Sequence, residues 1–329
     1  MKNNTLRHKA TAISPANIAF IKYWGKKDPK LNIPFNDSIS MNLSGCSTKT
    51  VVEYDPTFRN DLVIVNGTEV KDDKRKRVVD FLDIIRKMAG KKWFAKVVSD
   101  NNFPSDAGIA SSASAFSALA LAGSRAIGLE LPPRKLSILA RLGSGSACRS
   151  VFDGFSIWKK GSGNNSSYAV AFAKPNFWNL VDIVAVVDAG TKKASSTEGH
   201  EAATTSPYFK TRLNELKKRI PALKKAFLAR DFGKFGELVE EEAISLHVAA
   251  MTSRPPIFYW NKGTLEVMET VFGLRERGIP AYFTMDAGPN VHIICLDEDS
   301  KRVNLALKKL QFVKFTIINR PGKGTMLLK

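Results

Sequence analysis

Hydrophobic residues recur at helical spacing in several stretches of the chain. In residues 71–88, Val78, Phe81, Leu82 and Ile85 lie one to four positions apart with charged residues around them. This spacing places the apolar side chains on one face of a helix, so it predicts an amphipathic helix. Apolar spacing also predicts helices over residues 135–142, 208–228, 231–251, 261–277 and 297–310.

Shorter apolar or alternating runs predict strands between these helices. They cover residues 12–26, 36–43, 49–54, 62–65, 93–98, 181–187 and 312–318. A hairpin is predicted from 152–159 and 168–172, and two apolar strands flank the tight turn 286–290. Pro175 marks a possible domain boundary, because a new apolar strand starts shortly after it.

The stretch 102–116 changes from a loop into a helix. Gly108 and Ala110 leave its backbone open to a close ligand. The first turn of a helix has unpaired N–H groups and the positive end of the helix dipole, so an anion fits there, and Ser111 and Ser112 add hydroxyls. We interpret this stretch as a phosphate-binding loop. The alternative is an ordinary Ser-capped, Ala-rich buried helix.

Four other polar residues lie within or next to apolar or Gly/Ser-rich segments and are candidates for a functional role. Arg149 follows a Gly/Ser-rich segment and can hold a carboxylate or phosphate through two N–H groups, or it is a surface arginine in a flexible turn. Asp286 ends an apolar strand, which favours a catalytic carboxylate over an Asp that caps its own turn. Asn17 and Lys22 interrupt the opening strand, and each needs a partner if it is buried.

For three further segments we expect a structural role without catalytic or metal-binding chemistry. Residues 192–200 predict a polar loop rich in hydroxyls, and residues 321–325 predict a terminal turn. The predicted helix 231–251 contains Glu240, Glu241, Glu242 and His247, which raises the question of a metal site. Consecutive acids point in different directions on a helix, so we expect a solvated face instead.

Composition narrows the class of protein. The 329 residues are enough for one large or two ordinary domains, and no apolar run approaches the roughly 20 residues of a membrane helix. Three distant cysteines predict a reducing, cytoplasmic location without disulfides. The net charge of +19 attracts polyanions, but no basic–aromatic pattern predicts nucleic-acid binding, so we expect neither nucleic acid nor membrane as a partner.

Four ordered motifs resemble the GHMP kinase superfamily and, within it, the mevalonate diphosphate decarboxylases. The matching segments are 104–113 (Pro-Ser-Asp-Ala-Gly-Ile-Ala-Ser-Ser-Ala), 16–26, 143–150 and 285–290. The resemblance implies a two-domain α/β (α+β) fold with ATP in a cleft between the domains. It implies a ribosomal protein S5 domain 2-like N-terminal domain over 1–178, which carries the ATP phosphate loop, and a ferredoxin-like C-terminal domain over 179–329.

The same resemblance implies an ATP-dependent carboxy-lyase that uses ATP and Mg²⁺ and forms a homodimer. The family phosphorylates the tertiary 3-hydroxyl of 5-diphosphomevalonate, then releases phosphate and CO₂ to leave isopentenyl diphosphate, in isoprenoid biosynthesis. By this resemblance Asp286 accepts or orients the hydroxyl proton, and Arg149 holds the C1 carboxylate with Asn17 orienting it. Lys22 neutralises the phosphoryl group in transfer and the departing phosphate.

The resemblance also assigns residues to the two ligands. Those matched to ATP binding are Pro104, Ser105, Gly108, Ala110, Ser111 and Ser112, with Ser112 as the Mg²⁺ ligand. Those matched to the phosphorylated substrate are Tyr23, Lys26, Ser144, Gly145, Ser146, Arg149, Ser196 and Thr197.

Two positions depart from the family pattern. Relatives with a diphosphate substrate commonly have Met where this chain has His200, and Ser195-Ser-Thr-Glu-Gly-His200 is more similar to archaeal-type phosphomevalonate decarboxylases, which act on the 5-monophosphate. Asp106 places an acid inside the phosphate loop. Phosphomevalonate decarboxylation to isopentenyl phosphate therefore stays an alternative, and so does a mevalonate 3-kinase-like reaction without CO₂ release.

Overall fold

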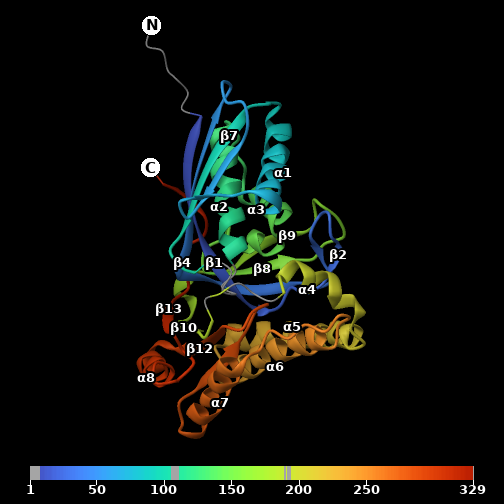
Figure 1. The fold of residues 1–329 in the computed structure, drawn as a ribbon. Helices are drawn as coiled ribbons and strands as arrows, with labels where there is room; N and C mark the ends of the chain where they lie inside the picture. The colour runs from blue at the N-terminus through green and yellow to red at the C-terminus, as the bar shows by residue number, and fades with distance from the viewer. Residues whose placement is uncertain (1–7, 105–110, 189, 191–193, 329) are drawn as a thin grey trace.

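The structure is a computed structural model, and it describes residues 8–104, 111–188, 190 and 194–328. An upper half built from the N-terminal part of the chain stands on a lower half built mainly from the C-terminal part (Figure 1). The strands are β1 (Lys9–Ile21), β2 (Lys26–Asp28), β3 (Ile33–Pro34), β4 (Ser38–Asp55), β5 (Leu62–Val65), β6 (Thr68–Glu69), β7 (Phe94–Asn101), β8 (Phe155–Lys159), β9 (Tyr168–Ala173), β10 (Leu180–Val186), β11 (Ala281–Thr284), β12 (Val291–Leu296), β13 (Phe315–Asn319) and β14 (Met326–Leu328).

The helices confirm most of the predicted positions. They are α1 (Asp72–Ala89), α2 (Ser111–Ala126), α3 (Pro133–Gly143), α4 (Ser196–Ala202), α5 (Phe209–Ala229), α6 (Phe232–Met251), α7 (Lys262–Glu276) and α8 (Asp297–Leu307), with short 3₁₀ turns η1 (Gly145–Arg149), η2 (Pro175–Phe177) and η3 (Ala203–Thr205). None of the helices in the described ranges combines the length and apolarity that a membrane crossing requires.

The upper half is organised around the long antiparallel pair β1 and β4. Sequence patterning predicted two separate strands at 36–43 and 49–54, but they form one strand. One end of β4 pairs with β8 and the other with β7, so partners distant in sequence hold both ends of this one strand. The described strands of this sheet run β14-β1-β4-β7-β5-β6, with β8 paired to β4 and β9 paired to β8. Apolar residues of α1, α2 and α3 pack against β4 and β7.

The lower half contains a sheet in the order β11-β12-β10-β13, with α7 and α8 packed against it. Every residue of β10 is buried, including Asp182, whose carboxylate is hydrogen-bonded to His292 and Asn319 of the neighbouring strands. A separate hydrophobic cluster includes Phe20 and Met41 from the upper half and Val184, Phe227 and Phe235 from the lower half. The two halves therefore share a continuous core.

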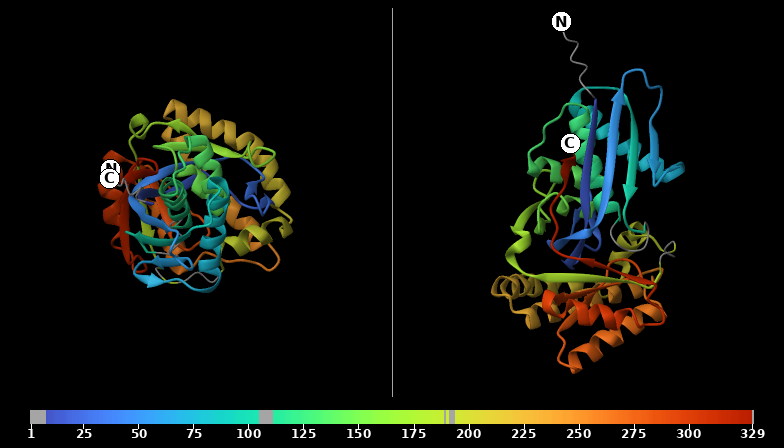
Figure 2. Two further views of the ribbon diagram at one scale, coloured as in Figure 1. Left: turned by 90° about the horizontal axis from the view of Figure 1, so that it is seen from above. Right: turned by 90° about the vertical axis from the view of Figure 1, so that its left-hand side faces the viewer.

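The end of the chain returns to the upper half, as the right-hand view of Figure 2 shows. The predicted terminal turn at 321–325 is instead a connection across the molecule. Pro321 forms an isolated bridge with Leu43, and β14 pairs antiparallel with β1. Side-chain patterning gave no signal for this pairing, because the β14 residues are largely exposed and their ladder consists of backbone hydrogen bonds.

The predicted polar loop at 192–200 is partly wrong. Residues 192 and 193 lie outside the described part, but α4 begins at Ser196. Ser195 accepts a hydrogen bond from the Glu198 N–H, and the Glu198 carboxylate accepts one from the Ser195 N–H. This reciprocal capping box was present in the sequence as Ser-x-x-Glu and was missed.

Candidate active site

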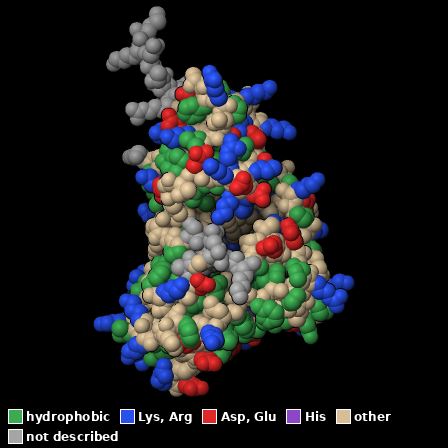
Figure 3. Space-filling view, in the orientation of Figure 1, with side chains coloured by type: hydrophobic (Ala, Val, Ile, Leu, Met, Phe, Trp, Pro, Cys, Tyr) green, Lys and Arg blue, Asp and Glu red, His purple; other side chains and the backbone are tan. Residues whose placement is uncertain are grey.

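A cleft of about 430 Å³ lies where the two halves meet. The face in Figure 3 is visibly hollowed between the upper and lower parts of the molecule. Contributions to the cleft come from the end of β1, the first turns of α1 and α2, η1, α4 and the turn after β11. The predicted site residues that line it are Tyr23, Lys26, Ser111, Ser112, Ser144, Gly145, Ser146, Arg149, Ser196, Thr197 and Asp286.

The predicted ATP end of the cleft is only partly described. Ser111 and Ser112 open α2, as expected, and the Ser112 hydroxyl lies 3.1 Å from that of Ser144. Pro104 does not line the cleft. Ser105, Gly108 and Ala110, together with Asp106, lie outside the described residues. Of the residues predicted to bind ATP, the structure therefore places Ser111 and Ser112 at the cleft.

Arg149 is held from behind by Asn17 and Ser38. Its Nε and Nη2 donate to Asn17 Oδ1 at 3.1 and 3.0 Å, and its Nη1 donates to Ser38 Oγ at 2.7 Å. Asn17 in turn donates to Ser150 Oγ and to the Ser146 carbonyl. A register shift in β1 immediately before Asn17 re-aims this side chain. Asn17 is buried and orients the guanidinium, while Arg149 itself reaches the cleft.

Lys22 and Asp286 form an ion pair that links the two halves. Lys22 Nζ lies 2.8 Å from Asp286 Oδ1, and the two side chains are 1% and 25% exposed. Burial lowers the pKa of Lys22 and outweighs the opposing attraction of Asp286. For Asp286 burial acts to raise the pKa, but the charge and hydrogen bond of Lys22 lower it below its usual range. Asp286 is therefore an ionised acceptor at the cleft wall.

Tyr23, Lys26 and the η1 turn form the other end of the cleft. A Cβ on Gly145 would lie 2.5 Å from the Tyr23 ring, so only glycine lets η1 approach the tyrosine this closely. The Tyr23 ring packs on Trp158 with a centroid distance of 4.6 Å. Burial and the nearby Arg77 guanidinium lower the pKa of Lys26.

The sequence interpretation missed Arg77 and Lys74 of α1, which also line the cleft. Arg77 donates to the Gly143 carbonyl at 2.8 Å, and its guanidinium lies 4.5 Å from the centre of the Phe116 ring. On the predicted helix both residues belonged to an ordinary charged face. Only the packing of α1 over the cleft distinguishes them from the other basic residues of that helix.

His200 sits inside the wall of the cleft in a neutral state. Its ring centroid is 4.2 Å from that of Tyr23, and its Nδ1 accepts the Gly25 N–H at 3.0 Å. Burial, and secondly the charge of Lys26, lower the pKa of His200 to about 3. The proton of the neutral ring then resides on Nε2. His200 fixes the turn between Tyr23 and Lys26 rather than adding positive charge.

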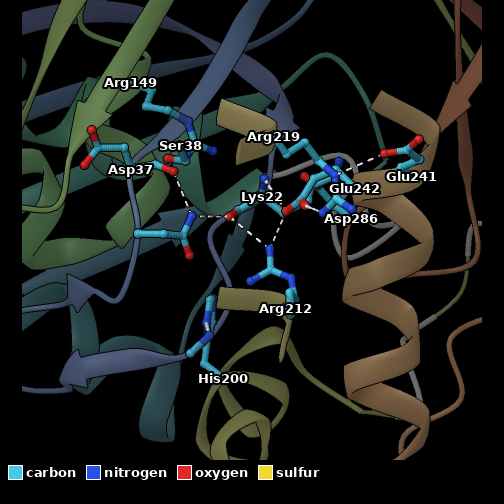
Figure 4. Close-up of polar contacts among 12 residues, drawn as sticks. Lys22, Asp37, Ser38, Arg149, His200, Arg212, Arg219, Glu241, Glu242 and Asp286 are labelled. Carbon is cyan, nitrogen blue, oxygen red and sulfur yellow. Dashed lines mark hydrogen bonds and ion pairs between the residues drawn. The ribbon is translucent and has the colours of Figure 1, made fainter. Parts of the chain in front are cut away.

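The prediction of a solvated face at Glu240–Glu242 was wrong for two of the three acids. Glu242 is fully buried against Arg212 and Arg219 (Figure 4). Glu240 pairs with Arg275, whereas the Glu241 side chain is 53% exposed. Within the described ranges, no group of three or more His, Cys, Asp or Glu side chains is arranged to hold a metal ion. Burial of each acid depends on arginines from other helices, which the sequence of α6 does not show.

The shared core, the hydroxyl-rich helix start and the cation-lined cleft define a two-domain enzyme of the GHMP kinase type. Residues 14–169 match the model described as diphosphomevalonate decarboxylase-like N-terminal domain, and residues 182–320 match the mevalonate 5-diphosphate decarboxylase C-terminal domain. The chain belongs to the diphosphomevalonate decarboxylase family.

Similar proteins span nearly the same length. The diphosphomevalonate decarboxylase of Candida albicans is 36% identical over 317 residues, which cover 91% of this chain and 87% of the relative. The structure of mevalonate diphosphate decarboxylase from Staphylococcus aureus superposes with a TM-score of 0.93 at 37% identity, covering 98% of each chain. A structure described as MDDEF in complex with MVAPP, AMPPCP and magnesium has a TM-score of 0.93 at 37% identity, covering 98% of this chain and 99% of the other.

Proposed function

We propose that this chain catalyses the ATP-dependent decarboxylation of 5-diphosphomevalonate to isopentenyl diphosphate, with release of ADP, phosphate and CO₂. The observation that carries the proposal is Asp286, which lines the cleft together with Arg149 and pairs at 2.8 Å with the buried Lys22, itself not part of the cleft wall. A carboxylate that accepts a proton, a buried ammonium and a guanidinium are the groups that a phosphorylation followed by decarboxylation requires. The similar structure described as a complex with MVAPP, AMPPCP and magnesium supports a mevalonate derivative and a nucleotide as the two ligands.

In the first step the tertiary 3-hydroxyl attacks the γ-phosphoryl group of ATP, and ADP leaves. Asp286 orients this hydroxyl and accepts its proton as the new O–P bond forms. Lys22, next to Asp286, stabilises negative charge on the phosphoryl group in transfer. Arg149 holds the C1 carboxylate, and Asn17 and Ser38 fix the direction of its guanidinium.

In the second step the C3–O bond breaks and phosphate departs with its electron pair. The C1–C2 bond then cleaves, its electrons form the C2–C3 double bond, and CO₂ is released. Lys22 stabilises the departing phosphate, while Arg149 keeps the carboxylate aligned until the bond breaks. The phosphorylated tail of the substrate would lie at the other end of the cleft, where Lys26 provides positive charge. The residues that would contact it are Tyr23, Lys26, Ser144, Gly145, Ser146, Ser196 and Thr197.

The residues at the start of α2 fit ATP and Mg²⁺. Ser111 and Ser112 present hydroxyls at a helix N-terminus, where phosphate oxygens are favoured. Mg²⁺ usually keeps several waters and takes few protein ligands beside phosphates, so one hydroxyl, that of Ser112, suffices. When bound, Mg²⁺ would neutralise charge on the nucleotide phosphates.

We extend the proposal to the organisation of the protein. Residues 1–178 would form the ATP-binding domain and residues 179–329 the second domain, a division that agrees with matched regions ending at 169 and starting at 182. The protein would act in the cytoplasm as a homodimer on small molecules, without nucleic-acid or membrane partners. These assignments follow from its family and its composition.

The test measures CO₂ and ADP formation with Mg·ATP, comparing 5-diphosphomevalonate with 5-phosphomevalonate at equal concentration. We expect equal amounts of CO₂ and ADP, and a higher kcat/KM for the diphosphate. Preference for the monophosphate would make the protein a phosphomevalonate decarboxylase, with His200 beside Tyr23 and Lys26 as the first residue to exchange. ADP formation without CO₂ release would leave a 3-kinase, and inactivity with both substrates would contradict the proposal.

A further inference from the structure

The main chain of Lys22 is held by side chains from other elements. β1 ends at Ile21, so Lys22 is the first residue beyond the strand. Its N–H donates to Glu242 Oε1 at 3.1 Å, and its carbonyl accepts Asn36 Nδ2 at 3.0 Å and Arg212 Nη2 at 3.4 Å. Figure 4 shows Glu242 and Arg212 beside Lys22, with Arg219 on the far side of Glu242. These three hydrogen bonds, with Glu242, Asn36 and Arg212, form a clamp on the main chain of Lys22 just beyond the end of β1.

Glu242 is the centre of that clamp. Its Oε1 accepts both the Lys22 N–H and Arg212 Nη2, and its Oε2 accepts Arg219 Nη1 at 3.0 Å. The carboxylate has no exposure to solvent. A buried carboxylate is tolerated only when charges and hydrogen bonds satisfy it, so the cluster fixes the distance between α6 and the end of β1. α5 supplies both arginines, which ties a third element to the same point.

The clamp and the catalytic pair share one residue. The backbone of Lys22 is bound to Glu242, and its side chain reaches Asp286. A displacement of the backbone would therefore move the ammonium relative to Asp286 and Arg149. We propose that Glu242 is a positioning residue for the reaction, which sets the place of Lys22 without touching substrate. This inference rests on the proposed function.

The charge of Glu242 also acts on Lys22. Burial lowers the pKa of Lys22, the Asp286 and Glu242 carboxylates raise it, and Arg149 lowers it. The charged or titratable groups around Lys22 come from the turn after β11, from α6, from η1 and from α5, and they are Asp286, Glu242, His247, Arg149 and Arg212. Removing the negative charge of Glu242 therefore lowers the pKa of Lys22 further, and the protonated form is lost at a lower pH.

The experiment compares Glu242→Gln with Glu241→Gln in the full-length protein. Glu241 is the neighbouring acid, but its side chain is 53% exposed and contacts Arg219 at 3.4 Å, so it is the matched control. For Glu242→Gln we expect kcat to fall about 10- to 100-fold while KM for ATP changes little. We also expect the basic limb of the kcat profile to shift to lower pH by about half a unit or more. Glu241→Gln should leave both unchanged.

Glu242→Asp distinguishes the effect of the position of Lys22 from the effect of the negative charge at residue 242. It also replaces Glu242→Gln in the test if that variant does not fold. It keeps the carboxylate but shortens its reach, so kcat should fall while the basic limb stays where it is in the wild type. A kcat equal to that of the wild type in either folded Glu242 variant would overturn the inference. So would a fall in kcat for Glu242→Gln without any shift of the basic limb. An inactive wild type would instead contradict the proposed function.

Discussion

At the scale of single residues, the site contains two kinds of polar side chain. Some are buried and orient other side chains, and others are exposed to the cleft, where a ligand can contact them. Asn17 uses its amide nitrogen on Ser150 and Ser146 and its oxygen on Arg149. The Asp286 side chain is one quarter exposed and accepts a hydrogen bond from Lys22. Asp286 is thus the acidic group of the pair that a substrate hydroxyl can reach.

Asp286→Asn keeps the shape of the side chain but removes the negative charge. We expect ATP binding to persist and kcat to fall at least about 100-fold, because no group accepts the hydroxyl proton and Lys22 loses its partner. Nucleotide binding by calorimetry and turnover by CO₂ release measure the two effects separately. Turnover within a few-fold of the wild type would show that Asp286 is not the proton acceptor.

At the scale of elements, α4 is seated on Trp24 and Tyr259 through a glycine. A Cβ on Gly199 would lie 2.3 Å from the Trp24 ring and 2.5 Å from the Tyr259 hydroxyl. The helix carries Ser196, Thr197 and His200, all of which line the cleft. The position of this part of the site therefore depends on the absence of one methyl group.

Gly199→Ala forces α4 away from Trp24 or distorts the rings beneath it, at about 1–3 kcal/mol of unfolding free energy. We expect KM for the phosphorylated mevalonate to rise by about tenfold or more, with a smaller change in KM for ATP. Gly163→Ala is the control, because a Cβ there meets no atom within 4 Å. Steady-state kinetics and urea unfolding of both variants test this, and an unchanged KM in Gly199→Ala would contradict it.

The elements themselves were mostly predictable. α1, α5, α6 and α7 follow from local periodicity, because each buries one apolar stripe against a sheet or a neighbouring helix. The continuity of β4 was not, since it depends on pairing with β7 and β8, which are distant in sequence.

At the scale of the whole molecule, Thr325 fastens the returning C-terminal segment. Its hydroxyl lies 2.8 Å from that of Ser14 and 2.6 Å from that of Ser117, and it donates to the Ser150 carbonyl at 2.9 Å. Strand β1, helix α2 and the residue after η1 are thus joined at one hydroxyl. Ser150 also accepts from Asn17, which connects this anchor to Arg149.

Thr325→Val keeps the volume of the side chain and leaves these buried polar groups short of a partner. We expect a loss of about 1–3 kcal/mol in the free energy of unfolding. Because the halves share a core, tryptophan fluorescence and far-UV circular dichroism should shift together in one urea transition. Thr325→Ser keeps the hydroxyl and should recover most of the loss. Separate shifts of the two signals would show that unfolding is not a single cooperative transition.

The sequence by itself determined what depends on near neighbours and on motif chemistry. It predicted the amphipathic helices, the apolar strands, the hydroxyls at Ser111 and Ser112, and the resemblance carried by Asn17, Lys22, Arg149 and Asp286.

Only the tertiary structure decided which distant groups meet. It buried Glu242 against arginines of α5, brought Arg77 of α1 to the cleft, seated α4 on Trp24 and returned β14 to β1. Each of these depends on partners far away in the chain. A side chain that looks solvated in its own helix is buried when another element satisfies its charge, and local periodicity holds no record of that partner.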